Sequence, residues 1–204
     1  MTEASTLAER LRPTIRDERV LAAIASIPRD RFVPPELRAR AYENVALPIA
    51  CGQTISQPLV VARMLEQLEL GPDDHVLDVG TGSGYHAALL ALLAGSVWTV
   101  ERHPQLSAAA RETIAGLGID NVQFVVGDGS LGLPEQAPFD AVNVAAATGE
   151  RMPAALEDQL REGGRLLAPV GTGEQYLVLS RRTTDGFERT ALESVRFVPL
   201  VRER

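Results

Sequence analysis

The stretch VLDVGTGSGY, residues 76–85, decides the fold that this sequence predicts. A short apolar run ends at Val79 and is followed by three glycines at alternate positions, Gly80, Gly82 and Gly84. Glycine lets a backbone turn sharply and approach a ligand closely. Because an apolar helical pattern begins directly after Gly84, the stretch predicts a strand, a ligand-binding loop and a helix in succession.

Strand and helix patterns alternate through the middle of the chain. We expect strands over residues 75–80, 97–101, 121–128, 139–147 and 165–171, and helices over residues 58–70, 85–94, 104–118 and 153–164. Strand–helix–strand units of this length predict a doubly wound α/β fold, whose mostly parallel sheet carries helices on both faces. Sheets of this class bind ligands at the carboxyl ends of their strands.

The two ends of the chain depart from this rhythm. Amphipathic patterns near residues 4–12 and 17–26 predict an N-terminal helical extension, and the proline-rich residues 27–37 are interpreted as a connector. The tail predicts two strands around a Thr-Asp-Gly turn, which form an antiparallel edge of the sheet. We expect a single domain over residues 1–204, with N-terminal helices and a substrate-side segment (1–57), a cofactor-binding core (58–171) and C-terminal strands (172–204).

Composition narrows the possible partners. The 204 residues carry a net charge of −7, which disfavours a broad basic surface for nucleic acid. The local cluster Arg29, Arg31, Arg38 and Arg40 is therefore interpreted as a solvated arginine-rich face. The chain has one cysteine, no signal-peptide pattern and no apolar run of the roughly 18 residues that a membrane span needs. We expect a cytoplasmic monomer without a membrane partner.

The absence of lysine and the spacing of the histidines exclude further classes of enzyme and of binding site. All twenty basic residues are arginine, and the absence of lysine excludes Schiff-base chemistry and the phosphate-loop nucleotide hydrolases. The three histidines, His75, His86 and His103, lack the spacing of metal ligands. We therefore expect no metal site and assign these histidines no function.

The spacing of the glycine loop indicates which cofactor it binds. A dinucleotide site needs G-x-G-x-x-G with a small last residue, and Tyr85 stands at that position. The observed G-x-G-x-G suits a ligand without a pyrophosphate. Glu101, at the end of the next expected strand, can accept both hydroxyls of an adenosine ribose, and Asp128 is placed for the adenine amino group. Asp78 can hold the loop backbone or the amino-acid end of the ligand.

A purely structural interpretation of the same residues is a glycine turn that packs a helix on a sheet. The placement of the loop, Glu101 and Asp128 on three successive strand ends favours a cofactor site instead. Together they resemble the class I S-adenosylmethionine-dependent methyltransferases over roughly residues 72–170. The resemblance implies that S-adenosyl-L-methionine is held by Gln57, Asp78, Gly80, Thr81, Gly82, Ser83, Gly84, Glu101, Asp128 and Gly129.

A second motif, GQTISQP at residues 52–58, narrows the substrate. With PRDRFVP (28–34) and RFVPL (196–200), it resembles the protein-L-isoaspartate O-methyltransferases from about residue 20 to residue 200. The resemblance implies methylation of the L-isoaspartyl carboxylate of damaged proteins or peptides, which starts repair through a succinimide. It also implies that Thr54 and Ser56 hydrogen-bond the acceptor carboxylate. The substrate site would be lined by Gln53, Ile55, Ala145, Ala146 and Val198.

The residue types agree with this chemistry. A carboxylate is already ionised at neutral pH, so the reaction needs no general base and depends on alignment and exclusion of water. Uncharged hydroxyls orient a carboxylate without quenching it. Ser56 is also placed to cap the following helix, which is compatible with this role. A nucleobase acceptor is disfavoured, because Asn143 is followed by no prolines and no aromatic residue.

Two residues depart from the family pattern beside the substrate pocket. Cys51 stands where relatives usually have an aromatic residue, histidine or glycine, and is interpreted as a small packing residue. Thr148 stands where many relatives have proline. These departures leave open a biosynthetic relative that esterifies an aspartate of a modified (RiPP-type) peptide to form an aspartimide. A module that only binds an adenosine ligand is disfavoured by Thr54 and Ser56.

Overall fold

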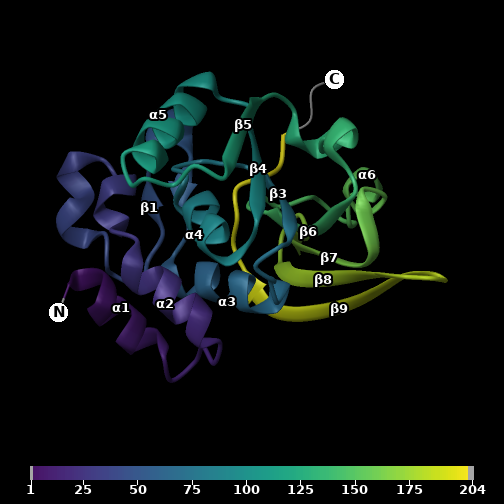
Figure 1. The fold of residues 1–204 in the computed structure, drawn as a ribbon, viewed down its shortest axis with the longest axis horizontal. Coiled ribbons are helices and arrows are strands. Elements are labelled where there is room, and N and C mark those ends of the chain that lie inside the picture. The colour runs from purple at the N-terminus through teal and green to yellow at the C-terminus, as the bar shows by residue number, and fades with distance from the viewer. Residues whose placement is uncertain (1, 202–204) are drawn as a thin grey trace.

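A seven-stranded sheet forms the centre of the molecule in a computed structural model, which describes residues 2–201 (Figure 1). Its strand order is β5-β4-β3-β6-β7-β8-β9. The strands span Val122–Val126 (β5), Ser96–Glu101 (β4), His75–Val79 (β3), Phe139–Val144 (β6), Leu160–Val170 (β7), Gln175–Thr183 (β8) and Gly186–Val195 (β9). The pairs from β5 to β7 are parallel, whereas β7–β8 and β8–β9 are antiparallel. The predicted sheet and its antiparallel C-terminal edge are confirmed.

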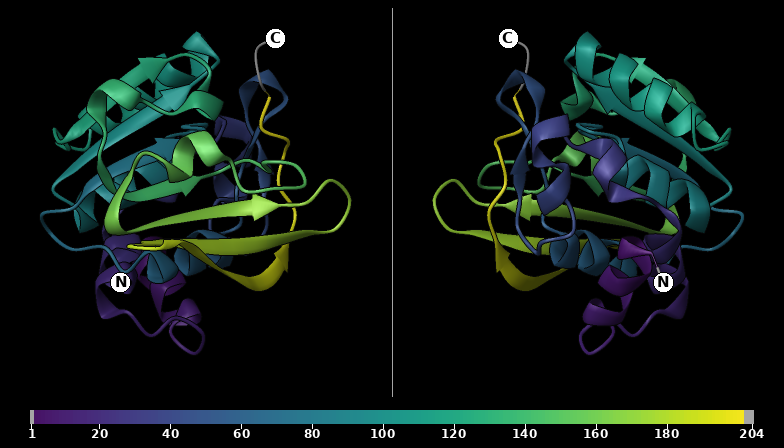
Figure 2. Two further views of the ribbon diagram at one scale, coloured as in Figure 1. Left: turned by 90° about the vertical axis from the view of Figure 1, so that its right-hand side faces the viewer. Right: turned by 90° about the vertical axis from the view of Figure 1, so that its left-hand side faces the viewer.

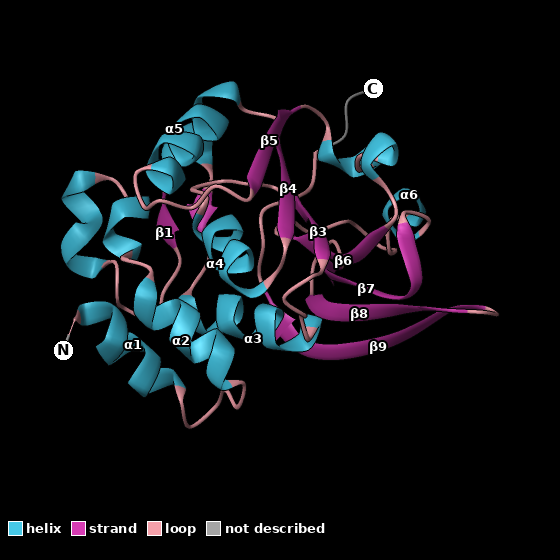
Figure 3. Ribbon diagram, in the orientation of Figure 1, coloured by secondary structure: helices cyan, strands magenta, loops and turns pink. Residues whose placement is uncertain are grey.

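Helices cover the two faces of the sheet unequally. They span Glu3–Leu11 (α1), Glu18–Ser26 (α2), Pro58–Leu68 (α3), Tyr85–Leu93 (α4), Pro104–Ala115 (α5) and Ala154–Glu157 (α6). On one face, α3, α4 and α5 contact the strands, and α2 lies over α3 and α4 as a further layer. Figure 3 shows α1 to α5 gathered on one side of the view, with the β8–β9 hairpin projecting from the other. The opposite face is covered by the short α6 and by three-ten turns.

Alternation along the central strands supplies two apolar cores. In β3, Val76 belongs to the core under α3 and α4, whereas Leu77 and Val79 belong to the core on the α6 side. Successive side chains of a strand point to opposite faces, so one strand serves both cores. All three residues are fully buried, as expected for a parallel strand that is covered on both faces.

The direction of winding reverses at β3. This strand pairs in parallel with β4 on one side and with β6 on the other. The connections therefore lead away from its carboxyl end in opposite directions, which opens a crevice there. The glycine loop after Val79 lies at this crevice.

A small hairpin carries the segment 52–58. Strand β1 (Leu47–Pro48) pairs antiparallel with β2 (Thr54–Ile55) around a three-ten turn at Ala50–Gly52. Ile55 is buried in the core at 3% exposure. Thr54 is exposed and Ser56, which directly follows β2, is half-buried.

The predicted helix over residues 153–164 is wrong beyond its first turn. Helix α6 ends at Glu157, and β7 begins at Leu160. Leu160 pairs with Phe139 of β6, and the residues from Arg165 onward pair with both β6 and β8, which outweighs the local helical preference of this stretch. The strand bulges before it re-enters register with β6, and a Cβ at Gly164 would lie 3.1 Å from the carbonyl oxygen of Phe139. The glycine pair at 163–164 thus belongs to a strand bulge and is not a helix stop.

The start of α4 offers a test of this packing. Gly84 has a φ of +88°, and a Cβ there would lie 2.8 Å from Cβ of Ala110 in α5. Gly118 has a φ of +75° but open space around it. Gly118→Ala should cost only the left-handed backbone, about 1–2 kcal/mol of unfolding free energy. Gly84→Ala should cost about 1–3 kcal/mol more through overpacking.

Urea unfolding of both variants measures this difference. Equal losses of stability in the two variants would show that α4 and α5 are not packed as closely as this structure has them.

Candidate active site

The loop after β3 is held in a conformation that glycine favours. The φ angles of Gly80, Gly82 and Gly84 are +93°, +53° and +88°. The N–H groups of Gly80 and Thr81 both donate to the carbonyl oxygen of Val100, at 2.9 and 3.3 Å. These bonds hold the loop against the end of β4, so its backbone lines a cavity.

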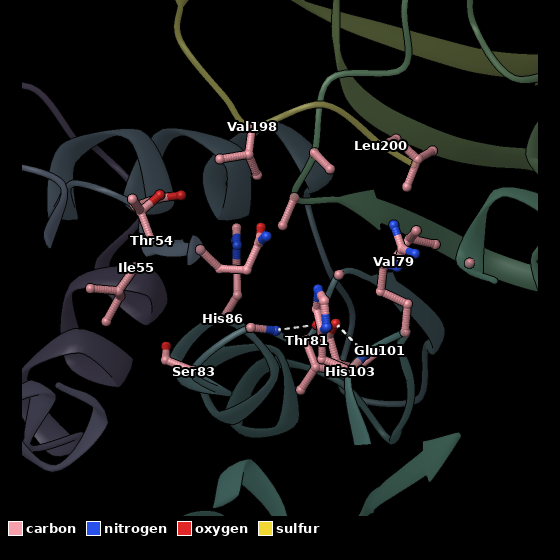
Figure 4. A pocket seen from close by; sticks show the side chains of 18 of the residues that line it. Thr54, Ile55, Val79, Thr81, Ser83, His86, Glu101, His103, Val198 and Leu200 are labelled. Atoms are coloured by element: carbon pink, nitrogen blue, oxygen red, sulfur yellow. Dashed lines mark hydrogen bonds between the residues drawn. The ribbon is translucent and has the colours of Figure 1, made fainter. Parts of the chain in front are cut away.

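Glu101 ends β4 at this cavity and is 5% exposed. Its carboxylate accepts hydrogen bonds from the backbone N–H groups of Gly82 and His103, both at 2.9 Å (Figure 4). A carboxylate has about four acceptor positions, so acceptor capacity remains for a ligand. The geometry suits the predicted contact with two ribose hydroxyls.

Asp78 supports the loop from inside the sheet. Its carboxylate is fully buried and accepts hydrogen bonds from Nδ2 of Asn143 at 2.7 Å and from Oγ1 of Thr99 at 2.8 Å. The hydroxyls of Thr99 and Thr81 are 2.6 Å apart, which connects this network to the loop. Burial raises the pKa of Asp78 to about 6 although both hydrogen bonds act to lower it. Asp78 does not line the cavity, and its predicted hydrogen bond to the loop backbone is not formed.

Thr54 and Ser56 lie on the opposite wall. Figure 4 shows Thr54 across the cavity from Glu101, with Val198 and Leu200 along a third side. Among residues 2–201, neither hydroxyl has a hydrogen-bond partner. The N-cap of α3 is Gln57 and forms no side-chain cap bond, so Ser56 does not cap this helix. Both hydroxyls are therefore free to bind a ligand.

The C-terminal segment completes the third wall. The N–H of Ala147 donates to the carbonyl oxygen of Val198, and the N–H of Leu200 donates to that of Ala147, both at 2.8 Å. Gln175 fixes the same segment, because its Oε1 accepts from the N–H of Phe197 at 2.7 Å. Both views of Figure 2 show this yellow segment running alongside the blue residues near position 50. Distant parts of the chain thus close one site.

Two hollows meet in this site. The first, the inner cavity, is lined by the glycine loop, Glu101 and the hairpin segment. The second, the outer groove, runs past Gln57 and β9 to Arg196. The two hollows share four lining residues: Thr54, Ser56, Ala145 and Val198. A molecule in one hollow can therefore meet a molecule in the other at the two hydroxyls.

Most of the predicted site residues line the inner cavity: Gln53, Thr54, Ile55, Ser56, Gly80, Thr81, Gly82, Ser83, Glu101, Gly129, Ala145, Ala146 and Val198. Four do not. Gln57 lines the outer groove, and Gly84 packs against α5. Asp128 accepts a hydrogen bond from the N–H of Ser130 at 2.9 Å and caps a three-ten turn, and Asp78 lies within the sheet.

Cys51 and Thr148 lie outside both hollows. Cys51 is exposed in the hairpin turn with a φ of +57°, so the prediction that it packs is wrong. The Thr148 hydroxyl donates to the carbonyl oxygen of Pro169 at 3.2 Å and supports the loop after β6. Neither departure from the family pattern alters the lining of the site.

Comparison with known proteins agrees with this geometry. A family model described as protein-L-isoaspartate(D-aspartate) O-methyltransferase matches residues 2–204. The chain belongs to this family. It is 53% identical over 188 residues to the protein-L-isoaspartate O-methyltransferase of Koribacter versatilis, covering 92% of this chain and 84% of that protein. The same enzyme of Dinoroseobacter shibae is 52% identical over 189 residues, covering 92% and 87%.

Solved structures of the same family share the fold. A Plasmodium falciparum protein assigned to the protein-L-isoaspartate O-methyltransferases, crystallised with S-adenosyl-L-homocysteine, superposes with a TM-score of 0.87. It is 27% identical, and the match covers 98% of this chain and 99% of that one. A second protein-L-isoaspartate O-methyltransferase has a TM-score of 0.85 at 29% identity, covering 95% and 64%.

The inner cavity of this methyltransferase fits S-adenosyl-L-methionine, the methyl donor of the family. Glu101 keeps acceptor capacity for the ribose, and the glycine loop leaves its backbone free to approach a ligand. A Cβ at Gly129 would lie 2.7 Å from Cγ1 of Val79, so the floor of the cavity requires glycine there. Within residues 2–201, no helix is long and apolar enough to span a membrane, and no cluster of side chains could hold a metal ion.

Several residues that line the inner cavity are not predicted from the sequence. Tyr85 and His86 begin α4 and line the inner cavity, as do His103 and the tail residues 199–201. Tyr85 and His86 directly follow the last glycine of the loop, and the first turn of a helix after such a loop faces the ligand. Their position directly after the glycine loop was the signal that could have identified them as lining residues. The histidines had been considered only as metal ligands.

The buried Asp78 generates a pH-dependent prediction. A free aspartate has a pKa of about 4, and burial raises that of Asp78 to about 6. The folded chain therefore binds the Asp78 proton more tightly than the unfolded chain does. The free energy of unfolding that this proton contributes is fully present below about pH 4 and is lost as the pH rises through 6. Asp78→Asn, which stays neutral, should gain about 3 kcal/mol relative to the wild type between pH 4 and pH 7.

Urea unfolding across this pH range measures the effect. Asp73→Asn, at an exposed position, makes the same change of residue type and is the matched control. A difference between Asp78→Asn and the wild type that stays constant with pH would contradict the raised pKa.

Proposed function

We propose that this methyltransferase acts where its two hollows meet, with Thr54 and Ser56 holding the acceptor carboxylate. The family methylates L-isoaspartyl residues, and the substrate peptide is assigned to the outer groove. The observation that carries the proposal is the set of four residues shared by the two hollows. We further propose that the active unit is a monomer.

The chemistry requires little beyond alignment. S-adenosyl-L-methionine, when bound, supplies an electrophilic methyl group on its sulfonium. The acceptor carboxylate is ionised at neutral pH, so the chain needs to orient one of its oxygens and exclude water. The Thr54 and Ser56 hydroxyls do this as neutral donors. The carboxylate oxygen keeps its electron pair for the new bond to carbon, and the resulting ester can close to a succinimide with loss of methanol.

Within the inner cavity, binding of the cofactor is assigned to the glycine loop and Glu101. Gly82 and His103 fix the Glu101 carboxylate through their N–H groups, so it is oriented before a ligand arrives. Preorganised acceptors of this kind lose little entropy on binding. The four-residue junction then sets the distance between the donor and acceptor molecules.

The biosynthetic alternative has no support from the site. It was motivated by Cys51 and Thr148, and neither residue lines the inner cavity or the outer groove. The wall formed by Thr54, Ser56, Ala145 and Val198 is the one that the resemblance to the repair enzymes of this family implies. Broad acceptance of damaged peptides is therefore the function that the geometry favours.

Paired peptides test this function. Unrelated short peptides that contain L-isoaspartate should be methylated, because the groove is proposed to recognise the carboxylate and the backbone of the peptide more than the side chains that flank the isoaspartate. The matching L-aspartyl peptides should be methylated little or not at all. The measurement is transfer of a tritiated methyl group from S-adenosyl-L-methionine to both members of each pair. Inactivity on every linear isoaspartyl peptide, with normal cofactor binding, would overturn the repair function.

The role of Ser56 has its own test. Ser56→Ala removes a hydrogen bond to a charged group, which is worth about 1.5–3 kcal/mol, so single-turnover methyl transfer should slow roughly tenfold to a hundredfold. The Kd for S-adenosyl-L-homocysteine should change by less than about twofold, because Ser56 is assigned to the acceptor.

Ser26→Ala is the control for this variant. Ser26 is exposed on α2, and its hydroxyl donates only to the carbonyl oxygen of Ala22. Wild-type single-turnover rates in Ser56→Ala would remove Ser56 from the acceptor site.

A further inference from the structure

Arg29 is fully buried, although the sequence predicts it on a solvated arginine-rich face. Its Nε donates to the carbonyl oxygen of Ala41 at 2.8 Å, and its Nη2 donates to that of Ser56 at 2.7 Å. The guanidinium thus ties the segment after the connector to the substrate hairpin. Prediction of a surface residue was wrong because both acceptors are remote in sequence.

The charge of Arg29 has no anionic partner within residues 2–201. No carboxylate among them lies within ion-pair distance. The adjacent Asp30 instead accepts a hydrogen bond from the Tyr42 hydroxyl at 2.7 Å. Nη1 has no hydrogen-bond partner, and the guanidinium carbon lies 4.8 Å from the centre of the Tyr85 ring. Burial lowers the pKa of Arg29 to about 10, so the group stays charged at neutral pH.

The neighbours of Arg29 do not offset its charge. Burial raises the pKa of Tyr85 to about 12, and burial together with Arg29 lowers the pKa of His86 to about 4. Both side chains are therefore neutral near pH 7. Tyr85 and His86 line the inner cavity, and the Tyr85 hydroxyl and Nε2 of His86 are buried without hydrogen-bond partners. One net positive charge thus lies behind the wall of the active site.

An uncompensated buried cation is costly, and proteins normally pair such a charge. The missing anion can come from a ligand that is itself a carboxylate. Arg29 is hydrogen-bonded to the main chain of Ser56, whose side chain faces the junction of the two hollows. The charge therefore lies directly behind Ser56, which is assigned to the acceptor site.

We propose that Arg29 is a positioning residue that fixes the Ser56 main chain and supplies the positive charge that balances the substrate carboxylate from behind the wall. This inference rests on the proposed function. Arg29 does not line either hollow, so it attracts the carboxylate through the protein interior without donating a hydrogen bond to it. In a region without water, charges interact over several ångströms much more strongly than at the surface. The nucleophilic oxygen thus keeps its electron pair while the pocket remains selective for an anion.

A pair of peptides separates the charge of Arg29 from its structural role. One peptide carries L-isoaspartate, and the other is identical except that the free carboxylate is a carboxamide. Their Kd values are measured by calorimetry with saturating S-adenosyl-L-homocysteine. Arg29→Met should raise the Kd of the carboxylate peptide about tenfold and that of the carboxamide peptide less than about twofold. The Kd of S-adenosyl-L-homocysteine alone should stay near the wild-type value.

Arg31→Met is the matched control, because Arg31 is exposed in the same three-ten turn and the change of net charge is the same. Its two peptide Kd values should match those of the wild type. Where Arg29→Met does not fold, Arg29→Gln removes the charge but keeps one donor and serves the same comparison. The difference between the peptides should persist at about 0.5 M salt, since buried charges are screened little.

Two results would overturn the role of Arg29. Equal weakening of both peptides would make Arg29 structural only, and a loss confined to S-adenosyl-L-homocysteine would assign its charge to the carboxylate of the cofactor. Methylation of the isoaspartyl peptide by the wild type tests the proposed function separately. If the wild type methylates this peptide and the Arg29 variants still distinguish the two peptides as the wild type does, the role of Arg29 is rejected and the proposed function stands.

Discussion

The reversal of winding at β3 is the constraint on which the rest of the structure depends. Because β4 and β6 both pair in parallel with β3, the chain cannot close over the carboxyl end of this strand from either side. The glycine loop occupies the opening, and the Val100 carbonyl and the Glu101 carboxylate hold it from the neighbouring strand. A binding site at this edge is therefore a consequence of the sheet order.

The remaining walls come from parts of the chain outside the parallel core. The hairpin that contains Thr54 and Ser56 precedes the core, and the segment around Val198 follows it. Both segments are short and carry few regular backbone bonds of their own. Each is fixed by a few long-range contacts, such as that of Arg29 with Ser56 and that of Gln175 with the tail. Loops positioned by a rigid sheet in this way can set substrate choice without disturbing the cofactor site.

Charge in this site is arranged by distance from the reacting groups. At the junction of the two hollows the side chains of Thr54 and Ser56 are neutral, and Ala145 and Val198 are apolar. Of the ionisable groups, Glu101 lies at the proposed ribose end, Asp78 within the sheet and Arg29 behind the wall, whereas Glu174 and Arg196 line the outer groove. Such an arrangement lets neutral donors orient a carboxylate, while buried charges set the local potential without contacting the nucleophile.

Local patterns in the sequence determined the parallel core, the glycine loop and the motif residues. Strand alternation, helical periodicity and glycine spacing act within a few residues, so β3, α4 and the antiparallel tail could be predicted before any contact was known. The family resemblance carried by GQTISQP pointed to Thr54 and Ser56, and both line the inner cavity. These features would hold in any fold that kept the same local geometry.

Only the tertiary structure decided the features that depend on remote partners. Residues 160–164 have helical preference, but pairing of Leu160 with β6, and of the residues from Arg165 onward with both β6 and β8, makes them part of β7. The sequence predicts Asp78 as a ligand contact, yet its carboxylate is buried within the sheet beside Asn143 and Thr99 and does not line the inner cavity. The sequence predicts Arg29 as a surface cation. In the structure it is buried and donates hydrogen bonds to carbonyl groups that lie 12 and 27 residues away in the sequence. Burial and hydrogen-bond partners are set by which distant segments the fold brings together, and no local pattern carries that information.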